Sequence, residues 1–259
     1  MEKYIFKKNQ LKPMLFGESL IWFGFWTALL IVFIYGGHSV VNQIGLSEFE
    51  GFVLVMTLPL SLMFVSAVVA YYAENKKNMG GFLNRYRMNK LKMKDIYWGV
   101  GLFIFMTFTY GLFSIIGKII LEKVNISIPT NLFSLIDPQF VMNTDNITKL
   151  VGSPIQGNYE VLILYFVMLL FNIMGEELLW RGYILPRQEL AYGKNTWILH
   201  GTMWTFFHLF KWWDLIGLLP VCLSLSYVAQ KSKSIWPGII AHFLFNGMGL
   251  VLFVFAVIG

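Results

Sequence analysis

Seven blocks of the chain are apolar over long stretches, and this feature constrains the fold more than any other. They cover about Leu15–Tyr35, Phe52–Tyr72, Ile96–Leu121, Tyr159–Pro186, Thr196–Phe210, Asp214–Ala229 and Ile235–Ile258. About 20 apolar residues cross a bilayer as a helix, and inside the hydrocarbon only helices and closed barrels satisfy every backbone polar group. The sequence therefore predicts an all-α fold, a polytopic transmembrane helix bundle with about seven spans.

The composition excludes a sizeable soluble domain. Apolar residues make up 57% of the chain and charged residues only 13%. Soluble domains carry about 25% charged residues, so this chain has roughly half the usual share. We therefore expect an integral membrane protein whose first apolar block is retained as a span.

The positive charge follows the loops between the apolar blocks. The net charge is +6, and basic residues gather in the head of the chain, in the loop 76–94, and in the turns Arg187–Lys194 and Lys231–Lys233. These four regions fall on one side when the spans alternate, and Lys211 is the one exception. The positive-inside rule then places the N-terminus in the cytoplasm. We expect membrane lipid and no nucleic acid as a partner.

Ionisable groups at membrane depth are concentrated in the C-terminal half. Each costs about 2.5–3.5 kcal/mol on insertion scales, so each calls for a reason. The polar residues concerned are Glu176, Glu177, Arg181, His208, His242 and Asn246. The N-terminal half has almost none, which points to a functional site formed by the later spans.

The spacing of these residues predicts which of them share a helix face. Glu177 and Arg181 are four residues apart and can form an ion pair. Glu176 is rotated by about 100° from its neighbour, so the arginine satisfies it less well, and Asn172 shares its face. A carboxylate at membrane depth that is only partly paired suits a general base.

Distance along the helices predicts a common depth. Glu176, His208 and His242 lie about 15, 18 and 10 Å from the expected cytoplasmic ends of their spans at 1.5 Å per residue. His242 and Asn246 are four residues apart and face the same way. We therefore expect one cavity, open to the cytoplasm, that these residues share.

Three motifs resemble those of the CAAX protease and bacteriocin-processing family, the CPBP or Abi family. Glu176–Arg181 reads Glu-Glu-x-x-x-Arg, Trp204–His208 resembles Phe-x-x-x-His, and His242–Asn246 reads His-x-x-x-Asn. The resemblance covers about Tyr159 to Gly249. It divides the chain into N-terminal spans and loops, 1–158, and catalytic transmembrane helices, 159–259.

The resemblance implies an intramembrane endopeptidase, a hydrolase acting near the cytoplasmic side. By position Glu176 would be the general base, and His208 would hold the attacking water. His242 and Asn246 would stabilise the oxyanion, and Glu177 with Arg181 would support the helix geometry. Trp204 stands where the family usually has phenylalanine, which bears on substrate fit.

The cofactor stays open between none and zinc. The family is commonly labelled metalloprotease, and Glu176, His208 and His242 could form a three-ligand metal site. The chain has no His-Glu-x-x-His pair, and the same residues also work as a glutamate base without metal. We prefer the metal-free reading.

The substrate is expected to be a membrane-associated peptide or protein. The residue usage favours a bacterial cell membrane, where peptide processing or bacteriocin immunity would be the role. The alternative is a non-catalytic membrane scaffold that binds and regulates a partner membrane enzyme. A proton-coupled transporter is a third reading, disfavoured because the first three spans lack matching polar positions.

Overall fold

The computed structural model describes residues 11–74, 81–129 and 132–259, and every regular element within these ranges is helical. The predicted all-α class is thus confirmed. The longer elements are α1 (Phe16–Ile31), α2 (Gly37–Ile44), α3 (Glu48–Glu74), α5 (Met93–Lys123), α7 (Tyr159–Glu176), α9 (Thr196–Phe207), α10 (Leu215–Ser232) and α11 (Trp236–Ile258). The shorter α-helices are α4 (Phe82–Arg85), α6 (Thr144–Val151) and α8 (Leu185–Tyr192). Basic residues predicted to orient the chain, Lys3, Lys7, Lys8, Lys76 and Lys77, lie outside the described residues.

Short π and 3₁₀ segments connect several of these helices. The π segments are η1 (Val32–Gly36) and η4 (Glu177–Ile184), and the 3₁₀ segments are η3 (Ser134–Ile136), η5 (Gly193–Asn195) and η6 (Leu209–Asp214). Gly193 ends α8 with a φ of +67°, a conformation that glycine adopts without steric cost. The chain therefore turns between α8 and α9 within three residues.

Six helices of the described residues are long and apolar enough to cross a membrane. They are Phe16–Val41, Glu48–Glu74, Met93–Lys123, Tyr159–Phe207, Leu209–Ser232 and Trp236–Ile258. The count agrees roughly with the expected seven spans. The difference arises because the tight turn at η5 joins two predicted blocks, Tyr159–Pro186 and Thr196–Phe210, into one helical stretch.

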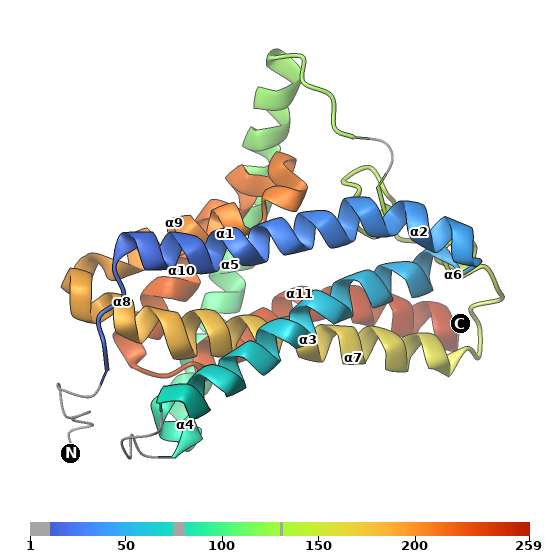
Figure 1. Ribbon diagram of the computed structural model, residues 1–259. Coiled ribbons are helices and arrows are strands. Elements are labelled where there is room, and N and C mark those ends of the chain that lie inside the picture. Colours follow the sequence, from blue (N-terminus) through green and yellow to red (C-terminus); the bar gives the residue numbers. More distant parts are fainter. Residues whose placement is uncertain (1–10, 75–80, 130–131) are drawn as a thin grey trace.

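The long helices pack into one bundle whose core is shared by the whole chain (Figure 1). In this bundle α5 packs against α10 and α11, α3 packs against α7, and α9 packs against α10. At Gly175 an added Cβ would lie 2.6 Å from the carbonyl oxygen of Leu60. Glycine at this position therefore permits the close approach of α3 to the end of α7 that carries the candidate site.

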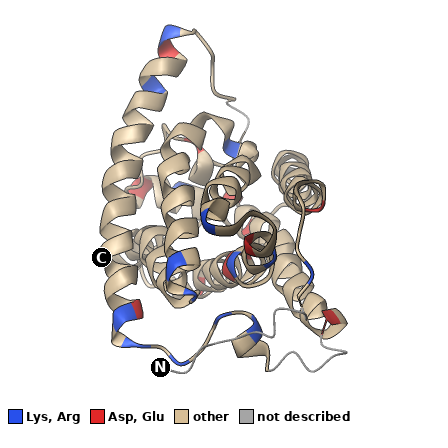
Figure 2. Ribbon diagram, turned by 90° about the vertical axis from the view of Figure 1, so that its left-hand side faces the viewer, with Lys and Arg blue, Asp and Glu red and all other residues tan. Residues whose placement is uncertain are grey.

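Charged residues lie mainly at helix ends and in loops (Figure 2). Many apolar side chains of the long helices face outward instead, such as Ile104 on α5, which is 62% exposed. Exposed apolar surface on long helices is what a lipid environment requires. The bundle thus has the polarity expected of a membrane-spanning domain.

Candidate active site

Glu176 lies in the last turn of α7 with its side chain buried and both carboxylate oxygens hydrogen-bonded. Its Oε1 accepts a hydrogen bond of 2.8 Å from Nδ2 of Asn172, one turn earlier on the same helix. Its Oε2 accepts a hydrogen bond of 2.7 Å from Nε1 of Trp204 on α9. Two donors from two helices therefore fix the orientation of this carboxylate.

The side chain of Glu177 contacts a histidine on α11. Its Oε1 lies 3.1 Å from Nδ1 of His242 and 3.3 Å from Nη1 of Arg181. The predicted ion pair between Glu177 and Arg181 is thus present, and both side chains are fully buried. Gly238 lies directly against this carboxylate, where an added Cβ would collide with it. The missing side chain lets α11 approach close enough for the histidine contact.

The segment η4 (Glu177–Ile184) winds as a π-helix between α7 and α8. The wider winding disturbs the regular α-helical hydrogen bonding, and exposed backbone groups then need other partners. The carbonyl oxygen of Gly182 accepts a hydrogen bond of 3.0 Å from Nη1 of the buried Arg85. Arg85 is held in turn by a hydrogen bond of 2.9 Å from its Nε to Oε2 of Glu74. Helix α4 and the end of α3 thus support the π segment that begins at Glu177.

Arg181 stacks on the ring of Trp204. Its guanidinium carbon lies 3.4 Å from the centre of the indole ring, and both side chains are buried. A cation above a desolvated indole face is stabilised by about 2 kcal/mol. Trp204 therefore serves two partners, Arg181 through its face and Glu176 through its edge. A phenylalanine at this position could offer only the face.

His208 follows the last residue of α9 and is half-buried. Its Nδ1 lies 2.9 Å from the carbonyl oxygen of Trp204. Because a carbonyl oxygen can only accept, Nδ1 must carry the hydrogen, and Nε2 of the neutral ring is then an acceptor. This histidine is arranged to accept a hydrogen bond from a water molecule or a substrate.

Asn246 on α11 connects to the same network. Its Nδ2 donates a hydrogen bond of 2.7 Å to Oδ1 of Asn172, whose own Nδ2 donates to Glu176. An amide nitrogen has two hydrogens, so Asn246 keeps one for another acceptor. Sequence reasoning placed Asn172 on the Glu176 face but missed this connecting role. The available signal was the spacing of four residues between Asn172 and Glu176.

One cavity of about 330 Å³ brings the predicted site residues together. Its polar lining includes Asn172, Glu176, Trp204, His208, His242 and Asn246. Most of the remaining lining is apolar, with residues such as Leu30, Met106 and Met168 from three different helices. Helices of both halves of the chain therefore form the cavity.

The cavity also reaches the segment between α5 and α7. Leu135, Ile136 and Met142 of that segment contribute to its wall. Alternation of the spans places this segment outside, opposite the basic loops, whereas the cavity was expected to open to the cytoplasm. The side on which it opens in a membrane stays a prediction.

The candidate metal ligands do not form a metal site as they lie. Within the described ranges, no three His, Cys, Asp or Glu side chains are grouped closely enough to hold a metal ion. A metal-binding role for Glu176, His208 and His242 stays a prediction.

Comparison with known proteins agrees with this geometry. Residues 158–248 match the family of type II CAAX prenyl endopeptidases described as Rce1-like. No curated protein and no solved structure gives a significant match. The matched range begins one residue before the predicted start of the motif-bearing segment and contains all three motifs. Together with the six long apolar helices, it identifies an integral membrane protein. The chain thus carries, over residues 158–248, an Rce1-like domain, and the CPBP resemblance predicted from the motifs is confirmed.

Proposed function

We propose that the protein is an intramembrane endopeptidase that hydrolyses a peptide bond in a membrane-associated peptide or protein. One observation carries the proposal. The carboxylate of Glu176 is fixed by two hydrogen bonds in the wall of a cavity that His208, His242 and Asn246 also line. Peptide hydrolysis needs a positioned base and a group that accepts a hydrogen bond from the attacking water. It also needs donors for the oxyanion, which here are an amide and an imidazole.

The first step forms the nucleophile. A water molecule donates one hydrogen bond to Glu176 and the other to Nε2 of His208. As the water oxygen attacks the peptide carbonyl carbon, the carboxylate of Glu176 takes its proton. The hydrogen bond from Nδ1 of His208 to the Trp204 carbonyl keeps the acceptor nitrogen available for this water.

The second step stabilises the tetrahedral intermediate. The new oxyanion accepts hydrogen bonds from the second amide hydrogen of Asn246 and from Nε2 of a protonated His242. The carboxylate of Glu177 contacts Nδ1 of the same ring and orients it. Protonated Glu176 then donates its proton to the leaving nitrogen, the carbon–nitrogen bond breaks, and the carboxylate is restored.

The apolar lining supports a substrate that comes from the membrane. Side chains such as Leu30, Met56 and Phe207 border the polar end of the cavity. We propose as substrates leader peptides, peptide precursors or lipid-modified C-termini, and peptide processing or bacteriocin immunity in a bacterial cell membrane as the role. We further propose that residues 159–259 supply the catalytic groups, that residues 1–158 complete the cavity wall, and that the N-terminus lies in the cytoplasm.

The test compares two glutamates on the same helix. Purified protein, Glu176→Gln and Glu160→Gln are incubated with a library of membrane-inserting peptides, some of them prenylated, with and without a chelator. Glu160 is exposed at the other end of α7, so its substitution controls for loss of one carboxylate. Cleavage by the wild type and Glu160→Gln, but not by Glu176→Gln, is expected. Inhibition by the chelator would show that a metal takes part.

Two other outcomes would contradict the proposal. Equal cleavage by all three folded proteins would remove Glu176 from the chemistry. No cleavage of any peptide by the wild type would favour the alternative, a scaffold that uses the same bundle to bind a partner membrane enzyme.

A further inference from the structure

Three hollows adjoin one another around the turn between α10 and α11, away from the candidate active site. The first, of about 450 Å³, is bordered by Lys194, Lys231 and Lys233. The second, of about 280 Å³, shares Lys233 with the first and is bordered by the basic residues before and at the start of α5. The third is an apolar groove of about 730 Å³ formed by α5, α9 and α10. It shares Trp197 and Tyr227 with the first hollow.

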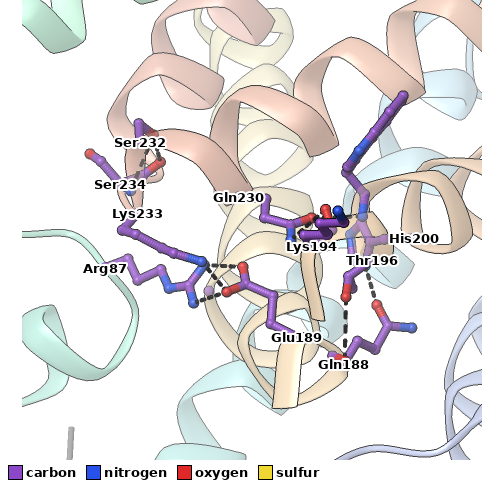
Figure 3. Close-up of polar contacts among 12 residues, drawn as sticks. Arg87, Gln188, Glu189, Lys194, Thr196, His200, Gln230, Ser232, Lys233 and Ser234 are labelled. Carbon is purple, nitrogen blue, oxygen red and sulfur yellow. Dashed lines mark hydrogen bonds and ion pairs between the residues drawn. The ribbon is translucent and has the colours of Figure 1, made fainter. Parts of the chain in front are cut away.

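The two polar hollows are strongly basic. Together they are bordered by seven cationic side chains and two carboxylates, a net charge of +5. Glu189 binds two of the cations, as Figure 3 shows. Nη1 and Nη2 of Arg87 donate to its two oxygens at 2.7 and 2.9 Å, and Lys233 contacts the same carboxylate. The other five form no ion pair with any described residue: Lys90, Lys92, Lys94, Lys194 and Lys231.

The wall of the first hollow is held in place by Gln230. Its Oε1 accepts a hydrogen bond of 2.7 Å from the backbone nitrogen of Trp197. Its Nε2 donates to the carbonyl oxygens of Gly193 and Lys194 at 2.9 and 3.2 Å. Figure 3 shows Gln230 beside Lys194, with Glu189 and Lys233 on its other side. The end of α10 and the turn before α9 thus form a fixed basic recess.

The apolar groove starts where this recess ends. Trp197 and Tyr227 pack edge to face at 5.4 Å between their ring centres at the junction. Trp98 and Phe105 on α5 border the groove further along and are 45% and 50% exposed. Tryptophan and tyrosine side chains, here Trp98, Trp197 and Tyr227, are enriched at the level of the lipid headgroups. The hollows therefore run from headgroup level into the hydrocarbon.

We propose that these hollows form a binding site for one anionic phospholipid. The phosphate lies between Lys194 and Lys231, and an acyl chain lies in the groove beside Gly101. Charge complementarity selects an anionic over a zwitterionic headgroup, because Lys194 and Lys231 form no ion pair with any described carboxylate. The apolar groove selects a lipid over a free anion. The site is separate from the cavity of the proposed peptidase.

Native mass spectrometry of the purified protein in an uncharged detergent tests the headgroup site. Phosphatidylglycerol and phosphatidylcholine with the same acyl chains are titrated onto the wild type, Lys194→Gln/Lys231→Gln and Lys118→Gln/Lys123→Gln. The last pair is exposed at the other end of α5 and removes the same charge. We expect the wild type to bind one phosphatidylglycerol per protein. The dissociation constant for this lipid should be about 30-fold higher for Lys194→Gln/Lys231→Gln than for the wild type, and unchanged for Lys118→Gln/Lys123→Gln. This factor corresponds to about 1 kcal/mol for each lysine near an anionic headgroup.

A second pair of variants tests the groove without changing charge. Gly101→Phe fills the groove, and Gly111→Phe places the same side chain elsewhere on α5. An added Cβ meets no atom within 4 Å at either position, so α5 has room for a side chain at both. We expect at least a tenfold rise in the dissociation constant for phosphatidylglycerol with Gly101→Phe and none with Gly111→Phe.

Four results would overturn the proposal. Phosphatidylcholine could bind as tightly as phosphatidylglycerol, or both lysine pairs could weaken binding equally. Millimolar inorganic phosphate could also displace the lipid, which would show an anion site that does not use the groove. Retention of the lipid by Gly101→Phe would exclude the groove as the place of the acyl chain.

Discussion

Replacing Trp204 by phenylalanine isolates one hydrogen bond of the candidate site. The substitution removes the indole Nε1, which donates to Oε2 of Glu176 at 2.7 Å, but keeps an aromatic face for Arg181. Hydrogen bonds to charged groups contribute about 1.5–3 kcal/mol. Since 1.36 kcal/mol corresponds to a factor of ten in rate, we expect Trp204→Phe to lower kcat by about 10- to 150-fold.

Trp180→Phe is the matched control. Trp180 is buried like Trp204 and stacks on Phe23 at 4.2 Å between ring centres. Its Nε1 has no hydrogen-bond partner among the described residues. The control therefore loses the same volume from the same bundle without losing a bond to Glu176.

The assay is cleavage of the peptide that the wild type cuts fastest, followed with enzyme in excess so that product release does not limit the rate. Thermal unfolding of each variant shows whether the bundle is intact. If Trp204→Phe slows cleavage no more than Trp180→Phe does, the indole nitrogen does not position the base. Our reading of the carboxylate geometry would then be refuted.

Two further substitutions test the oxyanion donor and the helix packing. Asn246→Leu removes an amide that we place at the oxyanion, so kcat in the same cleavage assay should fall by about 10²–10³; an unchanged kcat would contradict this role. Gly175→Ala should lower the free energy of unfolding by about 1–3 kcal/mol, because its Cβ would lie 2.6 Å from the Leu60 carbonyl oxygen. Gly24→Ala, where a Cβ meets nothing within 4 Å, should raise the unfolding temperature slightly or leave it unchanged. Equal unfolding temperatures for the two variants would show that α3 and α7 can separate without cost.

The membrane-spanning character of the fold could be predicted from the sequence because it depends on local composition. The block expected at Ile96–Leu121 corresponds to a helix from Met93 to Lys123, and the block at Phe52–Tyr72 to one from Glu48 to Glu74. The π-helix after Glu176 could not be predicted. Its hydrogen bonding depends on a partner distant in the chain, Arg85, which binds the Gly182 carbonyl.

The residues of the candidate site could be found because ionisable groups are rare at membrane depth. Glu176, His208 and His242 line one cavity, as expected from their depths along the helices, and Asn246 lines it too, as expected from its spacing to His242. Their partners could not be found in the same way. The donation from Trp204 to Glu176 depends on the relative rotation of α7 and α9, which no local spacing contains. The expected opening toward the cytoplasm also rested on span order alone.

The π segment Glu177–Ile184 fixes the angular register between α7 and α8. Each residue of an α-helix turns the chain by about 100°, and a wider π turn accommodates an additional residue without displacing the helix axis. Loss of one residue from this segment would rotate the face of α7 that carries Glu176 by about a quarter turn against α8. Glu189 on α8 contacts both basic hollows through Arg87 and Lys233. The same eight residues therefore set the angle, about the axis of α7 and α8, between the proposed peptidase cavity and the proposed lipid site.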